Sequence, residues 1–226
     1  MAKNGGMKKL PIYLVESKTK QNLAETFMRF QEYYESPVFK GKCFSVEEFA
    51  AWYAKEYGSF SYAQDWSGFN IPSWVLEPFK NGNFGNLTEK EQKLIDMFKN
   101  EEGDFYIIGA TPKDEWWADT VRHEFVHGAF CVNQNYRENV NYLLNSKKPA
   151  TVKKALGKMG YGKNVLEDEM NAYLLTEPQT LAKDISLGDG AGLRDVLDDV
   201  FKKYFGFSMI NVPLDTLMSR VEHVSL

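Results

Sequence analysis

The chain has 226 residues, of which 43% are hydrophobic and 26% are charged, the composition of an ordinary globular protein. Its formal net charge of −4 disfavours non-specific nucleic-acid binding, which needs clustered positive charge to neutralise phosphates. Two cysteines, Cys43 and Cys131, are too few for a disulfide scaffold or a thiolate zinc cluster. No apolar run approaches the roughly 18 residues of a membrane span or has the features of a secretory signal. We therefore expect a cytoplasmic protein with no membrane span and no nucleic-acid partner.

The N-terminal half mixes short strands with helices. Leu10–Val15 is an apolar run typical of a strand, and Gln21–Tyr34 carries apolar residues at helical spacing. Two capping boxes, in which a hydroxyl residue precedes a glutamate by three positions, predict helix starts: Ser45 with Glu48, and Thr88 with Glu91. These helices are expected to reach about Glu56 and about Lys99.

Residues 58–85 are rich in Gly, Asn, Ser and aromatic residues and predict a long irregular loop, the kind of segment that often serves or covers a site. Its rings would line a cleft or simply pack: Phe60, Tyr62, Trp66, Phe69 and Trp74. The run Phe105–Gly109 then predicts a buried strand that ends at a glycine.

The C-terminal half is predicted to be mostly helical. Thr111 and Pro112, followed by Asp114 and Glu115, predict the start of a helix that reaches about Asn133. Further helices are expected over Glu138–Leu144, Val165–Thr176, Gly192–Tyr204 and Pro213–Val224. The fold class is therefore α+β, with an α+β part over residues 1–110, a helical part over 111–226, and both expected in one compact unit.

The sequence His123-Glu124-Phe125-Val126-His127 has the pattern H-E-x-x-H, whose chemistry follows from helix geometry. Residues i and i+4 share one helical face, so both imidazoles can reach one zinc ion at about 2.0–2.1 Å. Glu124 is rotated by about 100° and points beside the ion, where its carboxylate can move protons. The pattern predicts His123 and His127 as zinc ligands and Glu124 as a general base and acid.

A catalytic zinc site needs a third protein ligand. A third histidine of the same motif is absent, because Phe130 and Asn133 occupy the positions where Gly and His would stand. Cys131 lies eight residues after His123, about 12 Å along a helix, so its thiol cannot join both imidazoles at one ion.

The remaining candidate for the third ligand is a carboxylate from the helix predicted over Val165–Thr176. Glu169 is favoured because it shares a helical face with Ala172 and Tyr173, and Asp168 and Glu167 are the alternatives.

The two motifs, His123–His127 and Glu169-x-x-Ala172-Tyr173, resemble the gluzincin class of zinc metallopeptidases, which pair H-E-x-x-H with a glutamate from a later helix. The second motif is also similar to the downstream glutamate helix of the ImmA/IrrE-like regulatory proteases. The resemblance covers Asp114 to about Thr176. It implies a zincin-like fold, with Glu169 as the third ligand and Glu124 as the base. By structural analogy, Phe105–Gly109 would be an edge strand that binds an extended substrate.

Tyr173, Tyr161 and His223 are the candidate donors to the oxyanion of the tetrahedral intermediate, and His223 is also an alternative ligand. Asp119, four residues before His123, is either a partner of that ring or an exposed helix acid.

The sequence thus predicts a zinc-dependent metallohydrolase that acts on a peptide or protein substrate. The alternatives are a non-hydrolytic metal-binding module that senses or binds a partner, and a zinc-free helical interaction protein.

Overall fold

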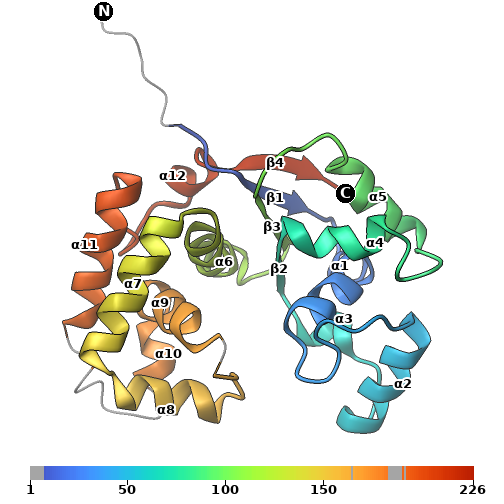
Figure 1. Ribbon diagram of the computed structural model, residues 1–226, viewed down its shortest axis with the longest axis horizontal. Coiled ribbons are helices and arrows are strands. Elements are labelled where there is room, and N and C mark those ends of the chain that lie inside the picture. Colours follow the sequence, from blue (N-terminus) through green and yellow to red (C-terminus); the bar gives the residue numbers. More distant parts are fainter. Residues whose placement is uncertain (1–7, 164, 183–189, 191) are drawn as a thin grey trace, which may run out of the picture. The chain divides into compact units, whose positions relative to one another are not determined.

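The computed structural model describes residues 8–163, 165–182, 190 and 192–226, which fall into two units (Figure 1). The sheet unit comprises Pro11–Val121 and Glu222–Leu226, and the helical unit comprises Arg122–Val221 with the residues up to Leu10. The mixed α+β class expected from the sequence is confirmed. Within the described part of the chain, no helix has the length and apolar character that a membrane crossing requires.

A four-stranded sheet with the order β2-β3-β1-β4 organises the sheet unit. Its strands are β1 (Ile12–Glu16), β2 (Gly68–Pro72), β3 (Tyr106–Ala110) and β4 (Glu222–Ser225). β1 runs parallel to both β3 and β4, with Leu14 opposite Ile108 on one side and opposite His223 on the other. β2 pairs antiparallel with β3. All five residues of β3 are buried, as expected for a continuous apolar run in the interior of a sheet.

The expectation that Phe105–Gly109 forms an edge strand is wrong. β3 lies between β2 and β1, so its backbone groups on both sides are hydrogen-bonded within the sheet and cannot pair with a substrate strand. The edge strands are β2 and β4, and β2 lies within residues 58–85, for which the sequence predicts an irregular loop. Asn70 fits in this strand because Tyr106 donates a hydrogen bond to its side chain at 2.6 Å and its amide donates to Gln31 at 2.9 Å.

Helices before and after β2 complete the sheet unit: α1 (Lys20–Glu35), α2 (Val46–Tyr57), α3 (Tyr62–Asp65), the 3₁₀ turn η1 (Ser73–Leu76), α4 (Glu77–Lys80) and α5 (Glu89–Met97). Both predicted capping boxes are confirmed: the hydroxyls of Ser45 and Thr88 accept from the amides of Glu48 and Glu91, whose carboxylates accept from the cap amides.

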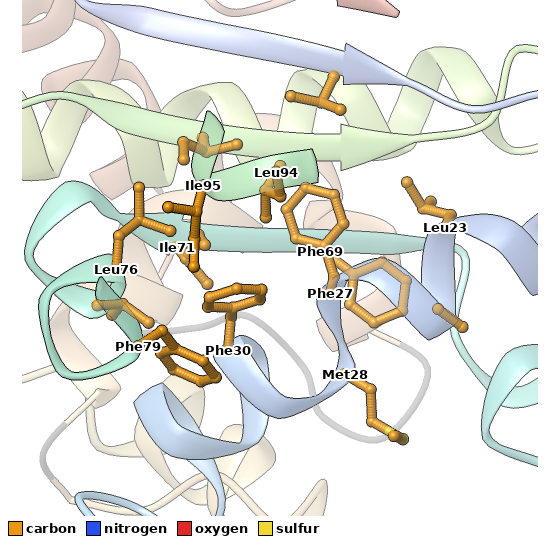
Figure 2. Close-up of a cluster of buried hydrophobic side chains, with 14 of the residues drawn as sticks. Leu23, Phe27, Met28, Phe30, Phe69, Ile71, Leu76, Phe79, Leu94 and Ile95 are labelled. Carbon is orange, nitrogen blue, oxygen red and sulfur yellow. The ribbon is translucent and has the colours of Figure 1, made fainter. Parts of the chain in front are cut away.

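The core of the sheet unit is built from aromatic and aliphatic side chains of α1, β2 and the helices that follow (Figure 2). The rings of Phe27 and Phe69 stack at 5.6 Å between centroids, and Phe30 lies 4.0 Å from Phe79. A Cβ at Gly109 would lie 2.8 Å from the Phe27 ring, so the close approach of α1 to β3 requires glycine there. In the segment 58–85, Tyr62 and Phe69 are core residues, whereas about half of the Phe60, Trp66 and Trp74 surface is exposed.

The helical unit contains most of α6 (Trp117–Val132), together with α7 (Gln134–Lys147), α8 (Ala150–Lys158), α9 (Leu166–Thr176), α10 (Pro178–Ala182), α11 (Leu193–Phe205) and α12 (Leu214–Met218). α9 packs against α7, α8, α10 and α11. Aromatic rings link three helices in the core of this unit. The Tyr136 ring of α7 lies edge-on to Phe201 of α11 at 5.6 Å, and the Phe125 ring of α6 lies tilted against Phe201 at 6.5 Å.

Two helix boundaries differ from the predictions. α6 begins at Trp117 and not at Pro112, because the Asp114 side chain accepts from the Trp116 amide at 3.0 Å and holds the preceding residues in turns. The predicted helix over Pro213–Val224 ends at Met218, and the chain then forms β4. Pairing with β1 outweighs the local helical pattern of these residues.

Candidate metal centre

The two histidines of the H-E-x-x-H motif lie one turn apart on α6, and their rings meet edge to face. The ring centroids are 4.9 Å apart, and the two Nε2 atoms are 3.2 Å apart. His127 is buried and His123 is partly exposed. Phe125, Val126 and Ala129 occupy the buried positions of this helix, which fixes the direction in which the imidazoles project.

Glu169 of α9 completes the group. Its Oε2 lies 3.8 Å from the Nε2 of His123 and 3.8 Å from the Nε2 of His127. This oxygen is buried and accepts no hydrogen bond among the described residues. The neighbouring Ala172 is fully buried. A buried carboxylate oxygen that faces two imidazole nitrogens without a hydrogen bond is costly unless something else binds it.

The spacing of these three atoms suits a tetrahedral cation. Two ligand atoms, each about 2.1 Å from a tetrahedral zinc, lie about 3.4 Å apart. The observed separations of 3.2, 3.8 and 3.8 Å bracket that value. Of all His, Cys, Asp and Glu side chains in the described part of the chain, only His123, His127 and Glu169 form such a group. Three protein ligands leave a fourth position for another molecule, as in catalytic zinc sites.

Each imidazole also has a partner at its other nitrogen. The Nδ1 of His127 lies 2.9 Å from a carboxylate oxygen of Asp168. The Nδ1 of His123 lies 3.4 Å from both the Thr176 hydroxyl and the Glu177 carboxylate. Such contacts favour the proton on Nδ1 and leave the Nε2 lone pair available to a cation.

Thr176 and Glu177 are not among the residues predicted from the sequence. They follow Tyr173 by three and four positions and so extend the helical face of Glu169 and Tyr173 by one turn. The helical spacing of Glu169 and Tyr173, extended by one more turn, predicts both positions.

Burial and nearby charges change the pKa of two members of the group. Burial opposes a charge on His127, but the nearby carboxylates of Asp168 and Glu169 outweigh burial and raise the pKa of the imidazole well above its usual value. Burial raises the pKa of Glu169, although the two histidines act in the opposite direction. Excess negative charge in a buried group is the setting in which a divalent cation binds well.

Tyr173 and Tyr161 lie at the same group. The Tyr173 ring packs edge-on against the His123 ring at 4.7 Å, and the Tyr161 and Tyr173 hydroxyls are 3.0 Å apart. Burial is the main cause that raises the pKa of Tyr173 to about 12, and burial also raises the pKa of Tyr161. Both phenols are therefore protonated at neutral pH and able to donate a hydrogen bond.

Glu124 lies in α6 beside the group and is partly exposed. Its carboxylate is close enough to His127, Glu169 and both tyrosine hydroxyls to raise their pKa values electrostatically. A carboxylate at this place can exchange protons with a molecule held at the fourth position.

The remaining predicted residues lie elsewhere. Within the described residues, the group of possible metal ligands includes neither Cys131 nor Glu167. Glu167 lies in the first turn of α9. His223 lies in β4 of the sheet unit, where its Nδ1 is 3.9 Å from a Glu16 carboxylate oxygen. Asp119 lies in the first turn of α6, ahead of His123. The roles considered for His223 and Asp119 stay predictions.

Comparison of the chain with protein-family models finds no match, and comparisons with curated proteins and with solved structures find none either.

Proposed function

We propose that the chain is a zinc-dependent metallohydrolase, a peptidase of the gluzincin type with a zincin-like arrangement of its two site helices. The observation that carries the proposal is the convergence of both Nε2 atoms and the buried Glu169 Oε2, at separations of 3.2–3.8 Å. Two imidazoles and one carboxylate are ligands that zinc accepts in hydrolytic sites.

The residues around the group have distinct tasks in this proposal. Zinc, when bound, supplies a Lewis acid that polarises the scissile carbonyl and lowers the pKa of water toward 7. Glu124 takes a proton from the attacking water and later gives it to the departing nitrogen. Tyr173 donates a hydrogen bond to the oxyanion, and Tyr161 orients the Tyr173 hydroxyl at 3.0 Å. Asp168 holds the ring of His127 in place.

Glu124→Gln tests the proposal directly. This substitution keeps the size of the side chain but removes the base, so we expect zinc content to stay unchanged and peptide cleavage to fall by about 10²–10⁴-fold. The measurement is turnover of a mixture of internally quenched peptides, together with zinc per chain. Glu138→Gln, the same change at an exposed position of α7, is the matched control and should cleave normally.

Cleavage by Glu124→Gln at the unaltered rate would contradict the role of Glu124. A zinc-loaded chain of the original sequence that cleaves no peptide would instead favour the non-hydrolytic metal-binding module.

A further inference from the structure

A continuous part of the helical unit carries only positive charge. Residues 139–166 contain no Asp or Glu and six lysines, in a chain whose formal net charge is −4. All six are exposed: Lys147, Lys148, Lys153, Lys154, Lys158 and Lys163. We call residues 147–163 the lysine segment. Three of its lysines lie on α8, opposite the buried stripe of Val152, Ala155 and Leu156.

The lysine segment adjoins the candidate metal centre within the helical unit. α8 packs against α9, the helix that carries Glu169 and Tyr173 (Figure 1). Tyr161 belongs to the segment, and its hydroxyl lies 3.0 Å from that of Tyr173. Lys158 and Lys163 are three and two residues from Tyr161, so their Cα atoms lie within about 10 Å of its Cα.

Among the residues that the structure describes, these lysines form no ion pair. Lys20, Lys80, Lys90 and Lys202 each pair with a carboxylate. By contrast, in the part of the chain that the structure describes, no lysine of the segment lies within ion-pair distance of an Asp or Glu. The closest acidic residues along the chain, Glu167 and Asp168, open α9, and Asp168 contacts His127. The positive charge is thus available to a bound molecule.

We propose that the lysine segment binds an acidic stretch of the peptide substrate beside the metal centre. The proposal deepens the peptidase function and rests on it. α8 extends for about 14 Å, and an extended peptide advances about 3.3 Å per residue. An extended peptide that lies along α8 therefore places about four of its residues beside these lysines.

The net charge of the chain favours a short acidic peptide over a nucleic acid as the bound molecule. Every basic residue of the segment is a lysine, a mobile point charge, and none is an arginine, whose planar group binds phosphate through two hydrogen bonds. The net negative charge of the whole chain also opposes a long polyanion, whereas a short acidic peptide meets only the local positive field.

The test compares two peptides of equal length, one with five Asp and Glu residues and one with Asn and Gln in their place. Binding is measured by fluorescence anisotropy to the Glu124→Gln chain, and cleavage by the original chain. We expect at least about tenfold tighter binding of the acidic peptide at low ionic strength, and a smaller difference at high salt.

The charge-reversed pair Lys158→Glu and Lys163→Glu should abolish this preference. Lys93→Glu with Lys99→Glu, two exposed lysines of the sheet unit, is the matched control and should retain it. Circular dichroism of each variant verifies the fold.

The outcomes separate this proposal from the peptidase function. Cleavage of both peptides with equal affinity overturns the acidic-substrate proposal and leaves the function intact. A preference for the acidic peptide that depends on Lys158 and Lys163 supports the surface, and absence of cleavage in that case overturns the function alone. Tighter binding of single-stranded DNA of the same charge overturns the assignment to a peptide.

Discussion

The two nitrogens of the His127 ring have different surroundings. Nε2 faces the Nε2 of His123 at 3.2 Å and Oε2 of Glu169 at 3.8 Å, whereas Nδ1 lies 2.9 Å from Asp168. A carboxylate at Nδ1 fixes the orientation of the ring and increases the basicity of Nε2. In the proposed zinc site, Asp168 therefore influences the metal through His127.

The substitution Asp168→Asn tests that role. The amide removes the negative charge but keeps the shape of the side chain, so we expect zinc affinity to fall by about 10–100-fold while the fold is retained. Competition with a chromophoric chelator measures the affinity. Glu167→Gln, the neighbouring neutralisation in the same turn of α9, should change it little. An equal loss of zinc affinity in both variants would contradict the specific role of Asp168, because it would show that only the total charge of α9 affects zinc binding.

Part of the site could be predicted from residue spacing. The positions of His123 and His127 follow from a four-residue spacing on a helix, and Glu169 was favoured by its helical face. The contacts of Asp168, Thr176 and Glu177 with Nδ1 atoms depend on the orientation of the rings. Tertiary contacts such as the one between His123 and Tyr173 set that orientation, and they leave no local pattern in the sequence. For that reason Asp168 was considered only as an alternative ligand.

At the scale of elements, the two capping boxes look alike in sequence but differ in surroundings. Glu48 is exposed and only caps α2. Glu91 caps α5 and also forms a buried ion pair with Arg29 of α1, with two contacts of 2.6 Å. Arg29 further donates to the carbonyls of Phe44 and Asn86. Glu91 therefore links α5 to α1, and Arg29 in turn links α1 to the backbone at Phe44 and Asn86.

Removing the two carboxylates should have unequal effects. Glu91→Ala leaves the buried Arg29 charge without its partner, so we expect the free energy of unfolding to fall by about 3–5 kcal/mol. Glu48→Ala removes only a cap and should cause a much smaller loss. Chemical denaturation of both variants measures the difference. A Glu91→Ala chain as stable as Glu48→Ala would contradict the structural role of the ion pair.

Asp198 of α11 fixes the residues that follow this helix. Its carboxylate accepts from the Met209 amide at 2.7 Å, from the Ser208 hydroxyl at 2.6 Å and from Lys202 at 2.8 Å. Burial alone would raise its pKa, but these donors outweigh burial and lower the pKa of Asp198 below its usual value. The folded protein therefore favours the ionised form more than the unfolded chain does.

This difference predicts a pH dependence of stability. A lowered pKa in the folded state means that the contribution of Asp198 is complete above the pKa of the unfolded chain, near 3.8, and is lost as the pH falls below it. Asp198→Asn should lower the free energy of unfolding by about 1–3 kcal/mol at neutral pH. The difference in the free energy of unfolding between the original protein and Asp198→Asn should become smaller below about pH 4, as measured by denaturation curves. A gap that is constant down to pH 2.5 or so would contradict the assignment.

Elements with strong local patterns could be predicted, and those defined by distant partners could not. The capping boxes marked α2 and α5, and apolar spacing marked α1, α9 and α11. β2 contains Gly68, Asn70 and Pro72 and is a strand because β3 pairs with it. The sequence does not predict α8, which has three lysines and one glycine among nine residues. Its short buried stripe is stabilised by packing against α9, which no local pattern shows.

At the scale of the whole molecule, the order of the strands in the sheet is the feature that could least be predicted from the sequence. β1 pairs with β4 from the far end of the chain, so the sheet unit includes residues that the prediction assigned to a C-terminal helix. The α+β class could be predicted from composition and periodicity. Side-chain packing across the sheet decides which distant segments pair, and the periodicity of a segment does not indicate its partner.

In the proposed function, one chain binds one metal ion through His123, His127 and Glu169. The most direct test is elemental analysis of protein prepared without a histidine tag, supplied with zinc and freed of excess. We predict about one zinc per chain, retained in His223→Ala and lost in His127→Ala. No bound zinc in the original chain, or the same zinc content in His127→Ala, would contradict the proposed metal site.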